Sequence, residues 1–429
     1  EYLKTMISIV TPPDPFLNVP YQNGAFLLAM ADWMILVDAR SSQELSMYNL
    51  PQLYRHLPLL TMDEAAGRRV SWWRAWLEHN TYDDYWMKLS YQDKYAQVKV
   101  PVLHITGWYD DDLVGSLLNY TGMLAQGGSA EARRGQKLLI GPWPHAVNSK
   151  QKLGDIDFGP DAVIDLNAVF LRWFDCHLKE IGCKELLSAP PVKLFVMGEN
   201  RWREEQEWPV SRAQLTPFYF HSQGRANTLS GDGTLSPTKP GDEPSDRFTY
   251  DPNDPVPFIF VPGSFQLGAT EDQRPVELRQ DVLAYTSAPL EEPLEVTGPI
   301  RVKLWAASSA PDTDFTAKLI DVHPDGYAQR LLDGIIRAHF RESFAQPTLL
   351  EPGKVYEYTI DLWATSNLFQ KGHRIRVEIS SSNFPKYARN LNTGKNNETS
   401  TEMQAAHQTI YHDAAHPSHI LLPVVPRPH

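Results

Sequence analysis

The sequence predicts an α/β fold class: part of a parallel-sheet domain with a helical cap, followed by an all-β domain of the jelly-roll type. Up to about residue 200, short apolar runs alternate with helical segments, which is typical of a parallel sheet. A helical, aromatic-rich stretch separates the first apolar run from the others. From Leu215 onward, period-2 alternation and turn clusters dominate, which indicates a β-sandwich.

The composition is that of a globular protein with two or three domains. Of the 429 residues, 42% are hydrophobic and 21% are charged, unlike a disordered or coiled-coil sequence. The net charge of −12 is spread without a basic patch, which argues against nucleic-acid binding. The sequence has no run of 18 apolar residues, so we expect no membrane span. Because residue 1 is Glu rather than Met, the compartment stays open.

The first apolar run, residues 2–10, predicts a short strand that stops at Pro12 and Pro13. A sheet that begins with this strand lacks its earlier members, so we expect them upstream of Glu1. Residues 21–95 form the predicted helical cap, with helices over residues 23–34 and 72–79.

The α/β domain comprises residues 1–20 and 96–200, and the jelly-roll domain comprises residues 201–429. Further strands of the α/β domain are expected over residues 98–106, 137–140 and 192–197, and helices over residues 114–125 and 166–181. Strands of the jelly-roll domain are expected to include residues 217–221, 300–305 and 374–379. The stretch 222–254 is rich in turn-forming residues and predicts a long surface connection.

Cys176 and Cys183 are the only cysteines. They lie on or just after the helix expected over residues 166–181. In a continuous helix their Cα atoms would be about 10 Å apart, which is too far for a disulfide. We therefore expect two unlinked thiols.

An acid and a histidine follow two predicted strands. Asp110 ends the segment Gly107-Trp108-Tyr109-Asp110, and His145 ends the segment Gly141-Pro142-Trp143-Pro144-His145. These are the positions of the acid and the base in the Ser…Asp…His order of α/β-hydrolases. Taken singly, a helix N-cap and a loop histidine are the plainer interpretations. Taken together with the strand placement, the two residues favour a catalytic pair.

The chain contains no matching nucleophile elbow, Gly-x-Ser-x-Gly between a strand and a helix. Ser129 lies in a polar loop, and the segment Gly263–Gly268 follows Pro262 without a helix after it. We expect the serine upstream of residue 1, in a missing N-terminal segment or on a complementary chain. The chain alone is then expected to be inactive.

Asp110, Asp111 and Asp112 form a run of three acids. Consecutive side chains point in different directions and no EF-hand spacing follows, so we expect no metal and no cofactor. Attraction of a cationic substrate group is an alternative role for Asp112. His104 is expected to be packed inside its strand, and His323 lies next to a turn. The histidines near the C-terminus, His407, His412, His416 and His419, match no metal-site template and are expected to be packed or solvated.

Several longer segments resemble the cocaine-esterase and α-amino-acid ester hydrolase family, relatives of the X-Pro dipeptidyl peptidases. The segments that carry the resemblance are residues 81–86, 100–110, 140–145, 314–322, 324–326 and 372–385. The similarity extends over essentially the whole chain.

The resemblance implies an α/β-hydrolase domain with a helical cap and a C-terminal jelly-roll domain. It implies Asp110 and His145 as triad acid and base, with the serine and a tyrosine oxyanion donor both upstream of Glu1. In α-amino-acid ester hydrolases a cluster of three carboxylates binds the α-ammonium group of the substrate. Two positions of this cluster correspond to Asp112 and Leu113 here. The third lies near residues 19–23, where this sequence has no acid. A broader esterase or a different acylase is therefore at least as well supported. Trp108 and Tyr109 are further candidates for substrate contact.

We expect a serine hydrolase that cleaves an ester or amide bond of a small molecule through an acyl-enzyme. The rival hypothesis is a non-catalytic jelly-roll binding module with a degenerate hydrolase remnant. Such a module needs an exposed aromatic platform, for which the candidates are Trp305, Tyr356, Tyr358 and Trp363. The substrate and the oligomeric state, including a homo-oligomer, stay open.

Overall fold

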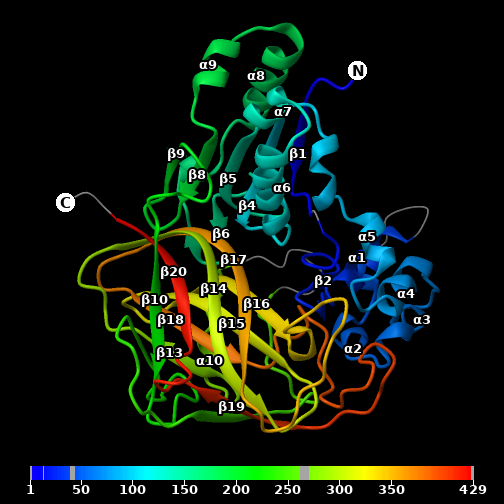
Figure 1. The fold of residues 1–429 in the computed structure, drawn as a ribbon, viewed down its shortest axis with the longest axis vertical. Helices are drawn as coiled ribbons and strands as arrows, with labels where there is room; N and C mark the ends of the chain where they lie inside the picture. Colours follow the sequence, from blue (N-terminus) through cyan, green and yellow to red (C-terminus); the bar gives the residue numbers. More distant parts are fainter. Residues whose placement is uncertain (1, 13, 39–43, 261–269, 427–429) are drawn as a thin grey trace.

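Figure 1 shows an α/β unit in its upper part, a β domain below it, and a helical segment beside both. The structure is a computed structural model that describes residues 2–12, 14–38, 44–260 and 270–426. The predicted fold class is confirmed, because a mostly parallel sheet with helices precedes an all-β domain.

A five-stranded sheet forms the centre of the α/β unit. Its strand order is β1-β4-β5-β8-β9, with the first four strands parallel and β9 antiparallel. The bounds are Met6–Ile9 for β1, Val102–Tyr109 for β4, Lys137–Pro144 for β5, Val192–Val196 for β8 and Arg201–Glu205 for β9. The sheet thus runs past residue 200, where the sequence placed the domain boundary. A tight turn with positive φ at Gly198 and Asn200 returns the chain along β8.

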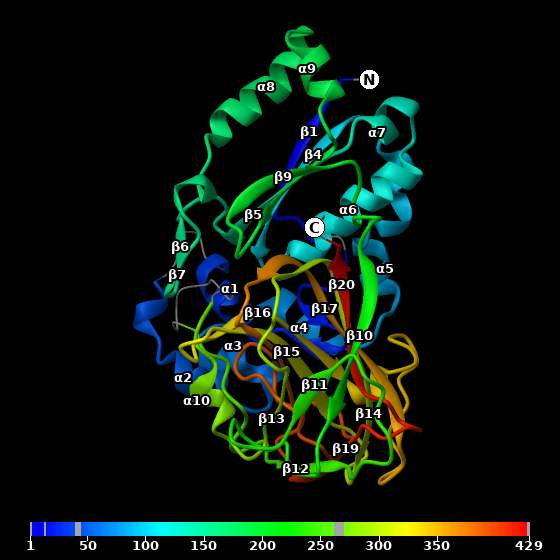
Figure 2. The same ribbon diagram turned by 90° about the vertical axis from the view of Figure 1, so that its left-hand side faces the viewer.

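Helices cover both faces of this sheet. Leu138 and Ile140 of β5 belong to one buried cluster with α6 (Leu113–Gln126), whereas Leu139 clusters with Trp173 of α8 (Leu166–Lys179). Because successive side chains of a strand point to opposite faces, α6 and α8 lie on opposite sides of the sheet, as Figure 2 shows. The smaller elements are α7 (Ala130–Arg134), β6 (Lys152–Leu153), β7 (Ile156–Asp157) and η4 (Pro160–Ala162).

The segment between β1 and β4 is mostly helical, as predicted. Its elements are α1 (Met30–Val37), η1 (Leu45–Met47), α2 (Leu50–Tyr54), η2 (Leu59–Thr61), α3 (Met62–Ala65), α4 (Ser71–Glu78), α5 (Asp84–Leu89) and η3 (Gln92–Gln97). The expected helix over residues 23–34 is wrong in its first half, where β2 (Tyr21–Gln22) and β3 (Ala25–Phe26) form a hairpin. Asn23 and Gly24 turn this hairpin at φ 47° and 81°. The Asn-Gly dipeptide was its signal in the sequence.

The helical segment packs against the β domain. Phe16, Trp73 and Trp86 share a buried cluster with Phe340 and Tyr387 of that domain. Within the described ranges, no helix has both the length and the apolar character needed to cross a membrane.

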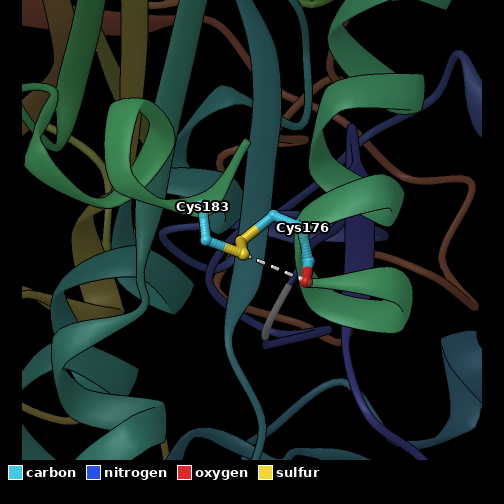
Figure 3. The surroundings of a disulfide bond; sticks show 2 residues. All are labelled: Cys176 and Cys183. Atoms are coloured by element: carbon cyan, nitrogen blue, oxygen red, sulfur yellow. Dashed lines mark hydrogen bonds between the residues drawn. A yellow bond between two sulfur atoms is a disulfide. The ribbon is translucent and has the colours of Figure 1, made fainter. Parts of the chain in front are cut away.

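The expectation of two unlinked cysteines is wrong, because Cys176 and Cys183 form a disulfide (Figure 3). The helix does not continue between them. α8 ends at Lys179, Glu180 and Gly182 adopt left-handed φ values of 60° and 67°, and α9 (Cys183–Ser188) then folds back. This reversal brings the two Cα atoms to 4.7 Å.

The β domain is one hydrogen-bonded path of strands, β12-β19-β14-β20-β10-β11-β13-β18-β15-β16, with β17 paired to β14. β14 and β15 are not neighbours on this path, yet Val302, Leu304, Ala317 and Leu319 from these two strands share one buried cluster. The path therefore curls over a single core. Its strands are β10 (Gln214–His221), β11 (Thr234–Ser236), β12 (Asp246–Tyr250), β13 (Leu283–Thr286), β14 (Leu294–Ser308), β15 (Asp314–Val322), β16 (Ala328–Arg337), β17 (Tyr356–Phe369), β18 (Arg374–Ser380), β19 (Ala406–Tyr411) and β20 (His419–Val425).

Two short helical elements accompany these strands, α10 (Arg274–Glu277) and η5 (Ala338–Phe340). The stretch 222–254 is not a simple surface connection, because it contains β11 and β12. β12 alternates buried and exposed residues, and the apolar Phe248 and Tyr250 anchor it where it pairs with β19.

Candidate active site

The pairing of β4 with β5 brings Asp110 and His145 together. Tyr109 and Pro144 are register partners at the carboxyl ends of these parallel strands, so the next residue on each strand enters the same region. Gly107 permits the close approach, because a Cβ at this position would collide with the backbone of Trp143. The two predicted residues therefore meet, with Asp110 Oδ1 3.0 Å from His145 Nδ1.

The Asp110 carboxylate is buried and fixed from three directions. Oδ1 faces His145 and also accepts the backbone N–H of Asp112 at 3.1 Å. Oδ2 accepts the hydroxyl of Thr106 at 2.7 Å. Asp110 is 2% exposed, so these contacts replace the hydration that burial removes. Sequence reasoning missed Thr106, since a threonine inside a buried strand carries no distinctive signal.

Asp112, rather than Asp110, directly precedes helix α6 as its N-cap residue, and its side chain makes no capping hydrogen bond. Its Oδ2 lies 3.7 Å from His145 Nδ1. Burial, reinforced by the charges of Asp111 and Asp110, raises the pKa of Asp112 to about 8. Burial and the charge of Asp110 likewise raise the pKa of Asp111 to about 6. The three acids thus crowd around one imidazole, and the raised pKa means that Asp112 keeps its proton up to about pH 8.

The His145 side chain is 32% exposed. Its hydrogen bond to Asp110 raises its pKa to about 9, together with the charges of Asp111, Asp110 and Asp112, while desolvation acts in the opposite direction. Asp110 holds Nδ1, which leaves Nε2 as the ring nitrogen through which a general base of this geometry takes a proton.

Asp110, Asp112 and His145 each offer a ligand atom within 4.8 Å of the others. The donor set is compatible with a divalent cation. Asp110 Oδ1, however, already has two hydrogen-bond partners, the backbone N–H of Asp112 and His145 Nδ1, and Oδ2 accepts the hydroxyl of Thr106. These bonds match an acid that orients a histidine.

Trp108 and Tyr109, the other proposed contacts, are buried against the rest of the molecule. The Trp108 indole N–H donates to the carbonyl of Phe195 at 2.7 Å, and the Tyr109 hydroxyl accepts from Gln329 at 3.1 Å. Both residues line a small cavity between the sheet and the β domain, together with Asp110, Asp111, Arg330, Trp363 and Lys386. Their role in substrate contact stays a prediction.

Ser129 is the N-cap of α7, where its hydroxyl accepts the backbone N–H of Ala132 at 2.8 Å. It therefore has an ordinary capping role. The segment Gly263–Gly268 lies outside the residues that the structure describes.

The four aromatic residues considered for a binding platform differ in their packing, and Tyr356 and Tyr358 contact each other edge to face. Tyr358 is 1% exposed and lies in the core of the β domain. Tyr356 lies under the guanidinium of Arg341, and Trp305 packs edge-on against His416. Trp363 lines the cavity beside Asp111.

Two family models match the chain. The X-Pro dipeptidyl-peptidase C-terminal non-catalytic domain matches residues 186–421, and the X-Pro dipeptidyl-peptidase S15 family matches residues 1–147.

Among curated relatives, cocaine esterase of Rhodococcus sp. (strain MB1 Bresler) is 42% identical over 369 residues, 84% of this chain and 63% of the esterase. The chain thus spans less than two thirds of that relative. Among solved structures, an α-amino acid ester hydrolase has 28% identity and a TM-score of 0.87, covering 98% of this chain and 73% of its own. An aminopeptidase from a marine sediment Thaumarchaeota archaeon has 26% identity and a TM-score of 0.86, covering 99% and 72%.

Proposed function

The chain belongs to the X-Pro dipeptidyl-peptidase (S15) family, and from this membership we propose that it carries the acid and the base of a serine hydrolase that cleaves ester or amide bonds. The 3.0 Å contact between Asp110 and His145 is the observation that carries the proposal. It joins two residues at the ends of adjacent parallel strands, in the chain order of an α/β-hydrolase triad.

In this mechanism His145 removes the proton of a serine hydroxyl as the oxygen attacks the substrate carbonyl. It then returns the proton to the leaving alcohol or amine, and an acyl-enzyme remains. Water, deprotonated by the same histidine, releases the acid product. Asp110 holds the Nδ1–H tautomer and stabilises the imidazolium. Thr106 and the backbone N–H of Asp112 hold Asp110 in turn.

The serine itself is supplied by polypeptide outside these 429 residues. The sequence lacks a nucleophile elbow, and in the described part of the chain β1 pairs on one side only, with β4. An unpaired strand edge accepts another strand readily. Helices α8 and α9 and the turn between them also present exposed apolar side chains, namely Leu171, Leu178, Ile181 and Leu187. Further chain packed beside β1 and these helices would complete the sheet and bring the serine to His145.

The substrate is a small ester or amide, in keeping with relatives named as esterase, ester hydrolase and aminopeptidase. Asp112 is the residue of this chain best placed to contact a cationic substrate group, because its buried carboxylate lies beside the proposed base.

A fluorophosphonate probe tests this function on the protein with its natural termini. Such a probe reacts only with an activated serine, so we expect one labelled serine, located by mass spectrometry of the peptides. Asp110→Asn and His145→Ala should slow the labelling strongly. Asp93→Asn, in the exposed part of η3, is the matched control and should label normally. An unlabelled protein that binds glycans would instead support the binding module.

A further inference from the structure

A second group of potential metal ligands lies in the β domain. Asp321 is near the end of β15, His323 begins the turn after it, and His373 directly precedes β18. β15 and β18 are antiparallel neighbours, with Val322 opposite Arg374, so these distant segments meet. One oxygen of Asp321 and one ring nitrogen of each histidine lie within 4.8 Å of one another.

Asp321 is a buried carboxylate that is paired with no lysine or arginine in the described part of the chain. Its side chain is 4% exposed, and its ion-pair partner is His373, with Oδ1 2.8 Å from Nδ1. Its Oδ2 accepts the amide of Asn367 at 3.2 Å. Other buried carboxylates of this domain face full cations, such as Glu378 with Lys318. A neutral imidazole at His373 would leave this buried charge without a cation, which is costly, so a positive ion beside Asp321 would stabilise the fold.

The two imidazoles are placed to share one ion. The rings of His323 and His373 have centroids 4.6 Å apart and an interplanar angle of 34°. His323 Nε2 lies 3.1 Å from Gln329 Oε1, and an oxygen acceptor on the outer N–H is the usual support of a metal-ligating histidine. Gln329 in turn donates to the Tyr109 hydroxyl, so the group is linked to the end of β4.

We infer that Asp321, His323 and His373 form a binding site for a divalent transition-metal ion of the Zn²⁺ class. Two imidazoles and one carboxylate are a donor set that such ions prefer. The ion connects the turn after β15 to the start of β18. Through the hydrogen bonds of Gln329 it also stabilises the position of Tyr109, the neighbour of Asp110. The site is structural and takes no part in acyl transfer.

The test removes metal from the protein with its natural termini by chelation and then titrates it with Zn²⁺ alone. Elemental analysis gives the stoichiometry, calorimetry gives the affinity, and the absorption spectrum with Co²⁺ reports nitrogen and oxygen ligands. We expect one Zn²⁺ per chain and a higher Tm with the ion bound. His323→Ala should weaken the affinity at least about 10-fold, because it removes a direct ligand.

Two variants serve as controls. His145→Ala disrupts the other described ligand group, that of Asp110 and Asp112, and should leave the bound zinc unchanged. His407→Ala removes an exposed histidine of β19 and should also have no effect. Less than one equivalent of Zn²⁺ at saturation, or zinc lost in His145→Ala but kept in His323→Ala, would overturn the inference. If His373→Ala does not fold, the half-buried His323 still permits the test.

Discussion

Thr106 Oγ1 donates a 2.7 Å hydrogen bond to Asp110 Oδ2, the carboxylate oxygen that does not face His145. Thr106 is fully buried in β4, so no water replaces this bond when the hydroxyl is lost. The bond therefore sets the orientation of the carboxylate that orients the imidazole.

We expect Thr106→Val to lower kcat about 10-fold while it changes KM little, since a buried charge-assisted bond contributes at least about 1.4 kcal/mol. Thr106→Ser keeps the hydroxyl and should restore most of the rate. The measurement is steady-state ester hydrolysis by the protein with its natural termini, with the His145 Nδ1 proton followed by NMR. Equal activity of Thr106→Val and the parent protein would contradict a positioning role, and Thr121→Val on α6 is the matched control.

Asp110→Asn is expected to lower kcat about 10⁴-fold, the magnitude typical of losing the triad acid while the geometry stays intact. An asparagine amide no longer selects the productive tautomer of His145, although it fills the same space. Circular dichroism should show an unchanged fold. A loss of less than about 10-fold would mean that another carboxylate, with Asp112 the nearest candidate at 3.7 Å, orients the histidine.

The pKa of His145, raised to about 9 mainly by its bond to Asp110, predicts the pH dependence of the reaction. A general base must be neutral, so kcat/KM should rise with pH up to about 9. Asp112→Asn removes one of the charges that raise this pKa and should move the rise to lower pH.

The stability of the protein changes with pH in the opposite sense. Because the pKa of His145 in the folded state exceeds the unfolded value of about 6.5, the pair of His145 and Asp110 contributes its full stabilisation below about pH 6.5. This contribution is lost as the pH rises through about 9.

An NMR titration of His145 checks the same shift without any turnover, so it separates the pKa argument from the proposed activity. An Asp112→Asn profile that stays in place or moves to higher pH would show that Asp112 does not act on His145.

The sequence predicts the pairing of Asp110 with His145 because each residue ends a buried strand of the same α/β repeat. The positions of these two strand ends can be read from short stretches of sequence. Parallel strands joined by short connections are usually neighbours in the sheet, so their carboxyl ends have few alternative arrangements. The register itself depends on a bulge between Gly107 and Tyr109. No composition or periodicity reveals such a bulge in advance.

What the sequence could not predict depends on contacts between distant segments or on chain reversals. The meeting of Asp321 with His373, and the link from Gln329 to Tyr109, join residues 52 and 220 positions apart. The disulfide depends on a chain reversal that two left-handed residues, Glu180 and Gly182, make after α8. A distance calculated for a continuous helix does not include this reversal. A Glu at one of these two left-handed positions gives no sequence signal, since left-handed conformations favour glycine and asparagine.

Reduction of the Cys176–Cys183 disulfide is expected to release the α8–α9 hairpin. By the loss of chain entropy in the unfolded state, a cross-link that closes so short a loop contributes about 2 kcal/mol to the free energy of unfolding. Thiol titration of the unfolded protein should find no free thiol before reduction and two afterwards. Cys176→Ser and Cys183→Ser, singly and together, should lower the free energy of unfolding by similar amounts, because either removes the whole cross-link. If the double variant is as stable as the parent, the bond does not stabilise the hairpin.

His412 is fully buried between two carboxylates, with Nε2 2.9 Å from Asp246 Oδ2 and Nδ1 3.3 Å from Glu243 Oε2. Burial lowers its pKa, but the hydrogen bond and charge of Asp246 outweigh burial and raise it overall. Burial alone would raise the pKa of Asp246. The hydrogen bond to His412 and further hydrogen bonds outweigh burial, so the pKa of Asp246 lies below its usual range. The charged pair thus contributes most between the unfolded pKa values of the two groups, about 3.9 and about 6.5.

The pair predicts a pH-dependent stability that a single replacement removes. Above about pH 6.5 the parent should lose stability as the raised pKa of His412 is passed, and on acidification below about 3.9 it should lose stability as Asp246 gains its proton. His412→Ala leaves Asp246 buried without its partner and should cost about 3 kcal/mol near pH 6. His407→Ala, at an exposed position of β19, the strand that ends just before His412, should change stability by less than about 0.5 kcal/mol. Denaturant unfolding at a series of pH values measures both effects, and parallel pH profiles for His412→Ala and the parent would show that the pair does not contribute.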